Sequence, residues 1–587
     1  MKRIASFFTA VALAGLPVMA QTDMGKVETD TTISRDIEVV KEYNPVIREA
    51  GKVNTMPELR DVDTKKIKTN YSIWTLPTTP VSEVIPTLDY AEASTPVPQD
   101  VHEGFVRVGG GNYTSFLGEV YTPLYKDGSY LIDFYGKHNS SFGDIELTKD
   151  MYPSLYRNLE SDALFNDNKA KVAFLKGIRN SEFSAFVDFG YNRFNYYGYD
   201  SFKDSLANNA KLNLSDDYKE QAFMNFNVNA RYRAKDFVGK WKYDVQTNYQ
   251  LFHNRNSLSE HTIYTNFQGV YRMETSMLGL NVDMYNIFMS RPDSSEFFRY
   301  GASDNLHSYT VLKLNPKYTF EGKSGMMQIG VIGTFCMGQG RPGSVMPDIY
   351  GHVQVIDKKW YVYAGVSGDF VVNSYRNVTM NNRYVSPDVR VEDTYVPIDI
   401  YAGTKIKFFN QLAVDLNIGY RVVNNPYFFV NRRTVDTVAA SAYHNIYDVV
   451  YCEDAGLFNA GLGIKYKWRD KADFAVKMKV NKWSLEKDET PWMQPKFELS
   501  ATSSYLPTDY LRFNIAYHLA TGREALVHGS SLEMNDVHDL SIGANYKVLS
   551  FADIFLNLNN ILCQEYESWY GYTSQGFNIM GGVSIVF

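Results

Sequence analysis

The chain of 587 residues is poor in cysteine and contains only Cys336, Cys452 and Cys563. The three are far apart and fit no metal-ligand spacing, and an odd number of cysteines builds no disulfide framework. Beyond the amino terminus no apolar run reaches about 18 residues, which argues against a helical membrane protein. The net charge is −7 and no basic block occurs, so we predict no nucleic-acid partner.

Motifs for catalysis and metal binding are also missing. Gly322-Lys323-Ser324 lacks the upstream glycine of a phosphate loop, because Lys317 stands at that position. The run Gly109-Gly110-Gly111 precedes no predicted helix, and there is no nucleophile elbow or H-E-x-x-H sequence. We therefore predict no catalytic residue, no metal site, no cofactor and no enzymatic activity.

Aromatic residues are abundant, at 15% of the chain with 44 Tyr and 36 Phe. The stretch Ser574–Phe587 has the clearest pattern, with two alternating rows of side chains. One row is apolar and ends on the terminal Phe587, and the other contains Asn578 and Ser584. Such an alternation is typical of a strand with one apolar and one polar face. Together with the aromatic carboxy terminus it predicts the last strand of an outer-membrane β-barrel.

Two segments precede the predicted barrel. Residues 1–20 have a charged start, an apolar core and a small-residue cleavage site, as in a secretory signal peptide. Residues 21–103 are polar and rich in proline, and they show no strand pattern of useful length. We predict that they form a mostly irregular arm, either periplasmic or threaded through the barrel lumen. The barrel itself is predicted to span residues 104–587.

The barrel prediction depends on repetition along the whole chain. For example, Met224, Phe226, Val228, Ala230 and Tyr232 alternate with Asn225, Asn227, Asn229, Arg231 and Arg233. Short connections alternate with long ones, as periplasmic turns alternate with extracellular loops. The predicted short turns are 126–128, 179–181, 235–239, 274–276, 321–325, 357–359, 409–410, 469–471, 507–508 and 548–550. The fold class is therefore all-β, a transmembrane antiparallel barrel of about 22 strands if the first hairpin turns at Asn112-Tyr113.

A barrel of this size has a wide lumen, which natural transporters keep plugged. An open lumen would leak, so we expect a filler. The candidates are the arm, another protein, or inward-folded loops such as 140–167, 198–219 and 427–450.

The carboxy-terminal sequence resembles the closing signature of TonB-dependent receptors. The resemblance is carried by Leu556–Leu562, Glu565-Tyr566, Tyr570-Gly571-Tyr572, Gly576 and the final strand. The matched motif covers about 30 residues, and the strand pattern extends over the whole predicted barrel. The resemblance implies a receptor-type barrel, and the composition is similar to that of barrels from Bacteroidetes-type bacteria.

The segment before the barrel departs from that family. Members carry a globular plug ahead of the barrel, whereas residues 21–103 are too few and too proline-interrupted for a full plug. Glu38, Val39 and Val40 resemble the short strand that TonB grips by β-augmentation. The alternative is a solvated arm without a partner.

Seven basic residues are predicted to line the lumen, because they share the polar parity of their strands. Two roles remain open: a path for anions, or pairing with lumen carboxylates such as Asp244 and Asp415. The seven are Arg231, Arg233, Lys240, Lys242, Lys477, Lys479 and Arg512.

The predicted loops contain clusters of aromatic residues. Such residues can anchor a binding surface, and the alternatives are an interfacial girdle or packing of loop against loop. The candidate residues are Phe297, Phe298, Tyr300, Phe428, Phe429, Trp569 and Tyr570.

Two functions remain open from the sequence. The first is an outer-membrane barrel that mediates or gates passage of a solute, with outer-membrane lipid and TonB as expected partners. The second is a non-transporting barrel subunit or docking platform, with surface lipoproteins on its loops. The predicted location in both cases is the outer membrane of a Gram-negative cell.

Overall fold

A computed structural model describes residues 104–146, 160–198, 220–290, 307–338, 340–387, 389–409, 411–431, 446–486, 489–527 and 529–587. The predicted signal peptide and arm, with Glu38, Val39 and Val40, lie outside the described residues, as do Phe297, Phe298 and Tyr300. Among the described residues, no helix is long and apolar enough to cross a membrane.

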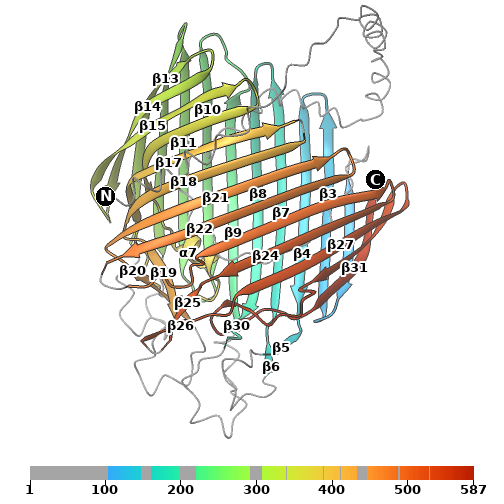
Figure 1. The fold of residues 1–587 in the computed structure, drawn as a ribbon. Helices are drawn as coiled ribbons and strands as arrows, with labels where there is room; N and C mark the ends of the chain where they lie inside the picture. Colours follow the sequence, from blue (N-terminus) through green and yellow to red (C-terminus); the bar gives the residue numbers. More distant parts are fainter. Residues whose placement is uncertain are drawn as a thin grey trace, which may run out of the picture. The chain divides into compact units, whose positions relative to one another are not determined.

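Twenty-two strands form one closed antiparallel barrel, which confirms the predicted fold class and strand number (Figure 1). The first hairpin turns at Asn112-Tyr113, as predicted. The barrel strands are β2 (Phe105–Gly111), β3 (Ser115–Asp127), β4 (Tyr130–Ser141), β7 (Phe165–Ile178), β8 (Ser181–Asn195), β9 (Glu220–Ala234), β10 (Trp241–Asn254), β11 (Ser259–Arg272), β12 (Ser276–Ser290), β13 (Tyr309–Glu321), β14 (Gly325–Met337), β15 (Gly343–Ile356), β16 (Trp360–Val371), β17 (Thr394–Phe408), β18 (Leu412–Asn424), β21 (Asp454–Trp468), β22 (Ala472–Leu485), β23 (Phe497–Thr508), β24 (Leu511–Thr521), β27 (Val537–Leu549), β28 (Ala552–Asn559) and β31 (Asn578–Val586).

The alternation of side chains has the predicted sense. On β31, Ile579, Val583 and Ile585 are exposed on the outer face, whereas Asn578 and Ser584 are buried on the lumen side. Period-two strands produce these two faces because successive Cβ atoms point to opposite sides of the sheet. The outer face is therefore apolar and the lumen face polar, as in an outer-membrane barrel.

The two ends of the barrel differ. The short turns lie at one end, the turn end, where Gly104 and Phe587 exchange backbone hydrogen bonds of 2.9 Å. The turn predicted at 507–508 instead lies at 509–510, because β23 continues to Thr508, which pairs with Leu511. Large exposed aromatics collect there, with Phe409 85% and Tyr510 62% exposed. A girdle of aromatics at the interface is typical of membrane barrels. The long connections lie at the opposite end, the loop end.

The barrel closes where β31 pairs with β2, from Phe105↔Val586 to Gly111↔Met580. Glycine is required at this seam because the ring of Phe555 on β28 lies over it. A Cβ at Gly109 would lie 2.8 Å from Phe555 Cζ, and one at Gly582 would lie 2.1 Å from the Val108 carbonyl oxygen. At the seam the backbones of β2, β28 and β31 therefore approach closely beneath the Phe555 ring, and only glycine leaves enough space.

The long connections contain structure of their own. Four carry two-stranded sheets: β5 (Asp144–Glu146) with β6 (Glu160–Asp162), β19 (Tyr427–Asn431) with β20 (Tyr447–Tyr451), β25 (Glu524–Val527) with β26 (Ser530–Glu533), and β29 (Glu567–Trp569) with β30 (Tyr572–Thr573). The connection from β16 to β17 carries the short helix α7 (Tyr375–Asn381), which begins where the Ser374 side chain accepts a hydrogen bond from the Asn377 N–H.

Candidate functional site

The connections at the loop end pack into one buried hydrophobic core, which we call the loop cap. It combines lumen-facing wall residues of β8, β9 and β10 with residues from seven connections. In Figure 1, α7, β19, β20 and β30 are grouped at this end. The buried members are Phe194, Tyr196, Phe223, Phe252, Leu258, Tyr375, Val378, Val385, Val389, Val391, Phe429, Ile446, Tyr447, Val449, Met493, Ala525, Met534, Tyr570 and Tyr572.

Three tyrosines at the loop cap form a junction: Tyr197, Tyr384 and Tyr572. Their connections follow β8, β16 and β28, which are nearly evenly spaced around the ring. The Tyr197 ring lies 5.8 Å from that of Tyr384 and 5.0 Å from that of Tyr572, centroid to centroid. Connections that start on three sides of a ring can meet only by crossing its mouth. The tyrosine junction therefore places protein across the loop end of the lumen.

Hydrogen bonds also join the connections that follow β8, β16 and β28. Tyr197 Oη donates to the Thr573 carbonyl at 2.9 Å, and Tyr196 Oη donates to the Val385 carbonyl at 2.9 Å. Gly198 allows the close fit, because a Cβ there would lie 2.5 Å from the Tyr572 ring. Aromatic packing and satisfied hydroxyls together fix one arrangement of the loops.

Burial controls the ionisation of groups in the loop cap. It raises the pKa of the Tyr197, Tyr384 and Tyr572 hydroxyls well away from neutrality, so the tyrosine junction stays uncharged. Burial also raises the pKa of Glu567 to about 7, although the Gly571 N–H and the Arg523 guanidinium oppose this shift. The protonation of Glu567 is therefore sensitive to pH near neutrality.

Arg523 is the largest fully buried polar side chain of the loop cap, with 1% exposure. Its guanidinium donates to the carbonyls of Glu567 at 2.8 Å, Ser568 at 3.3 Å and Asn535 at 3.1 Å. One side chain thereby ties the connection from β24 to β27 to the connection from β28 to β31. Burial lowers the pKa of Arg523 to about 10, so the group remains charged at neutral pH.

Four of the predicted aromatic loop residues lie in the described part of the chain, and all four lie within or against the loop cap. They are Phe428, Phe429, Trp569 and Tyr570. Phe428 packs edge-on against Trp483 at 5.2 Å, and Phe429 packs against Trp569 at 5.1 Å. Tyr570 is buried and accepts a hydrogen bond at its carbonyl from Tyr447 Oη. The contacts of Phe429 and Tyr570 are packing of loop against loop, one of the alternatives that the sequence left open, whereas Phe428 packs against the barrel wall at β22. Tyr197 and Tyr384 were not singled out from the sequence.

The predicted lumen cations differ in their surroundings. Arg231 forms an ion pair with Asp244, and Arg233 donates to Glu182 at 2.7 Å, so these two follow the pairing alternative. Lys240 lies outside the strands, in the turn before β10, with Nζ 6.0 Å from the centroid of the Tyr271 ring. The remaining members, Lys242, Lys477, Lys479 and Arg512, lie on β10, β22 and β24.

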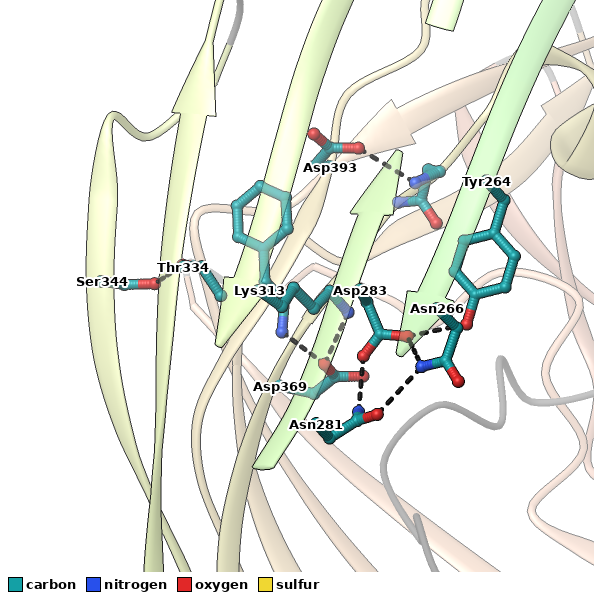
Figure 2. A network of polar contacts seen from close by, with 11 residues as sticks. Tyr264, Asn266, Asn281, Asp283, Lys313, Thr334, Ser344, Asp369 and Asp393 are labelled. Atoms are coloured by element: carbon teal, nitrogen blue, oxygen red, sulfur yellow. Dashed lines mark hydrogen bonds and ion pairs between the residues drawn. The ribbon is translucent and has the colours of Figure 1, made fainter. Parts of the chain in front are cut away.

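One wall of the lumen, from β11 to β16, holds a dense polar network (Figure 2). Asp283 accepts hydrogen bonds of 2.7 Å from Tyr264, Asn266 and Asn281. Lys313 donates to Asp369 at 2.9 Å. Asp283 is thus satisfied by neutral donors and Lys313 by a carboxylate, all on the same wall, which leaves these groups little capacity for a ligand. Among the described residues, no group of three or more His, Cys, Asp or Glu could hold a metal ion.

The sequence matches no protein-family model and no curated protein. Solved structures, however, share the fold. The FrpB iron transporter from Neisseria meningitidis aligns with a TM-score of 0.63 and 11% identity, over 83% of this chain and 82% of that one. The siderophore receptor PirA from Acinetobacter baumannii aligns with a TM-score of 0.62 and 10% identity, over 84% and 81%.

A ferric enterobactin receptor from Pseudomonas aeruginosa aligns with a TM-score of 0.58 and 10% identity, over 84% and 81% of the two chains. These neighbours are TonB-dependent receptors. At such low identity the likeness concerns the fold alone. The fold resemblance drawn from the carboxy-terminal sequence is therefore confirmed at the level of the barrel.

Proposed function

We propose that this chain is an outer-membrane barrel that mediates or gates the passage of a solute, with the loop cap as its extracellular gate. The observation that carries the proposal is the tyrosine junction, where connections from three sides of the ring meet across the mouth. A solute that entered from this end would have to pass the junction, so these buried, hydrogen-bonded contacts lie where a gate would act. The shared fold with siderophore and metal receptors supports a transport role.

The orientation follows from the two ends. Short turns face the periplasm and long connections face the outside in outer-membrane barrels. The loop cap would then meet solutes first, and the turn end would receive the arm of residues 21–103. In this proposal TonB is the energy-transducing partner, engaged through Glu38, Val39 and Val40.

The second candidate is a barrel subunit or docking platform that carries surface lipoproteins. The small hairpin of β25 and β26 favours it, because every described side chain of β26 is exposed, including Leu532. An exposed hairpin at the loop end offers unpaired edges for another protein.

Planar-bilayer recordings separate the two candidates. Four forms of the purified protein are compared: wild type, Tyr384→Ala with Tyr572→Ala, a deletion of residues 21–103, and the deletion combined with both substitutions. A gate predicts that the combined variant conducts in large, steady steps, whereas the wild type is silent. Silence of the combined variant, shown to be folded by heat-modifiable mobility in electrophoresis, would exclude the gate and favour the platform.

A further inference from the structure

Six lysines face the lumen on neighbouring strands, and we call them the basic wall. They begin beside the turn end, since Lys407 precedes the last residue of β17 and Lys467 the last residue of β21. Their register partners on adjacent strands are often small, as in Gly463↔Lys477 and Gly461↔Lys479. The members of the basic wall are Lys405, Lys407, Lys465, Lys467, Lys477 and Lys479.

Positive charge is in excess on this part of the lumen. Lys405 pairs with Asp415 at 3.4 Å, and the nearby Arg421 pairs with Asp399 at 3.1 Å. The other five lysines form no ion pair with a residue that the structure describes. The lumen rows of β17, β18 and β21 to β23 offer only two further carboxylates, Asp473 and Glu498. On the adjoining wall, by comparison, Lys313 has a carboxylate partner in Asp369 (Figure 2).

The basic wall also has space in front of it. A cavity of about 580 Å³ lies along β16 to β18, β21 and β22. Lys465, Lys477 and Lys479 line it together with Asn417 and Asn481. Uncompensated lysines beside a cavity attract an anionic occupant, because field lines are focused between low-dielectric walls.

We propose that residues 72–103 of this same chain are that occupant. The segment carries five carboxylates and no Lys or Arg, so its charge is complementary to the basic wall. The carboxylates are Glu83, Asp89, Glu92, Asp100 and Glu103.

The position of the segment's end agrees with this assignment. The segment leads directly into Gly104, which is bonded to Phe587 at the turn end of the barrel. The chain thus arrives at the end of the lumen where Lys407 and Lys467 lie. A segment of this length can span up to about 100 Å when extended, which is ample to reach any strand of the ring.

Zero-length carbodiimide cross-linking of the full-length protein tests the contact directly, because it joins only carboxylates and amines that touch. We expect amide links from Glu83, Asp89, Glu92 or Asp100 to Lys465, Lys467, Lys477 or Lys479, identified by mass spectrometry. The matched control is the lumen pair Lys169 and Lys171 on β7, which faces another wall. Equal cross-linking to the control pair, or none to the basic wall, would overturn the proposal.

Chymotrypsin cleavage at Trp74 and Tyr90 gives a second measurement. Substituting all four of Lys465, Lys467, Lys477 and Lys479 by Gln should speed this cleavage roughly tenfold, because proteolysis follows the population of the released segment. Lys169→Gln with Lys171→Gln should leave the rate unchanged. Folding of every variant is checked by heat-modifiable mobility.

The alternative occupant, an anionic solute, has a different signature. Cleavage would then proceed equally fast in all variants. The quadruple lysine substitution, introduced into the conducting cap and deletion variant, would still remove its anion preference in bilayer recordings. That outcome would overturn docking of residues 72–103 and would leave the transport proposal standing. Silence of the combined cap and deletion variant would overturn the gate and would leave docking of residues 72–103 standing. The two proposals therefore fail separately.

Discussion

The ring of Tyr384 stacks on the ring of Tyr572, with centroids 3.6 Å apart and planes 18° from parallel. Tyr384 follows α7, and Tyr572 is the first residue of β30. This contact therefore joins connections that leave the barrel wall far from each other. An aromatic pair contributes on the order of 1 kcal/mol beyond the burial of area. The closure of the mouth thus depends on a few well-defined contacts that can be changed one at a time.

Replacing Tyr572 by Ala should open the loop cap. Tyr572 is fully buried and packs against Tyr197, Tyr384 and Tyr447. Removing a buried aromatic ring costs about 3–5 kcal/mol, which is enough to populate an open mouth. The measurement is hydrogen exchange of residues 567–573, with Tyr510→Ala at an exposed turn as the control. Unchanged protection in Tyr572→Ala would contradict the assigned role.

Tyr572→Phe should behave quite differently. Within the described part of the chain, the Tyr572 hydroxyl is buried without a hydrogen-bond partner. An unsatisfied buried hydroxyl costs about 1–3 kcal/mol, so its removal should be neutral or stabilising. The same exchange experiment should show protection equal to or greater than that of the wild type. A loss of protection would mean that the hydroxyl has a partner.

Arg523→Ala should loosen two connections together. The substitution leaves the carbonyls of Glu567, Ser568 and Asn535 without their donor. Leaving a buried acceptor unsatisfied costs about 1–3 kcal/mol. Exchange should therefore rise both in residues 529–536 and in residues 567–573. The control is Lys496→Ala, whose exposed pair with Glu524 contributes no more than about 1 kcal/mol.

The loop cap should be tighter at acidic than at alkaline pH. Burial raises the pKa of Glu567 from its ordinary value of 4.5 to about 7. At pH values between these two pKa values, Glu567 is protonated in the closed state and ionised in the opened state. The stabilisation is fully present below pH 4.5 and is lost as the pH rises through 7. Opening of β29 and β30, measured by exchange corrected for intrinsic rates, should increase on the order of tenfold from pH 5.5 to 8.

Glu567→Gln is the decisive variant for this pH dependence, because it keeps the shape of the side chain but cannot ionise. Its exchange should be independent of pH after correction. Asp393 serves as the control carboxyl, since burial raises its pKa only to about 6 and it lies in another connection. Asp393→Asn should leave the response of β29 and β30 intact. A response that persists in Glu567→Gln would assign it to another group.

The seam glycines should differ sharply in their tolerance. Gly582→Ala should prevent closure, because its Cβ would meet the Val108 carbonyl oxygen at 2.1 Å. Gly109→Ala meets the Phe555 ring at 2.8 Å, so Phe555→Ala should partly rescue it. Gly581→Ala is the matched control, since its nearest neighbours lie at 3.7 Å. Heat-modifiable mobility reports barrel closure, and equal mobility of Gly581→Ala and Gly582→Ala would contradict this account.

The barrel could be predicted from sequence because its strands obey a local rule. Residues such as Val228 and Asn229 alternate between a lipid face and a polar face, and this alternation is visible without any tertiary information. The turn at Asn112-Tyr113 and the short turns followed from the same pattern, although the turn predicted at 507–508 was placed two residues too early. Even the total of 22 strands was accessible, because each break in the alternation marks a change of direction.

The loop cap could be predicted only in outline. Aromatic clusters at Phe428 and Trp569 indicated either packing or binding, and the sequence could not decide between them. The contact between Tyr384 and Tyr572 has no local signature, because irregular connections have no period and their meeting depends on the closed ring. Pairing of Arg231 with Asp244 was similarly one of two alternatives. Lys240 shares a parity with Lys242 but lies in a turn, where parity has no meaning.

The pairing of β31 with β2 also constrains how the molecule is made. These two strands lie at opposite ends of the barrel sequence, so the ladder between them has the largest sequence separation in the fold. Until it forms, the sheet has two open edges, which are templates for pairing with other chains. Contacts of such long range form slowly. The growing protein therefore passes through a stage with unprotected edges, and it depends on the cell to shield them until the last strand is in place.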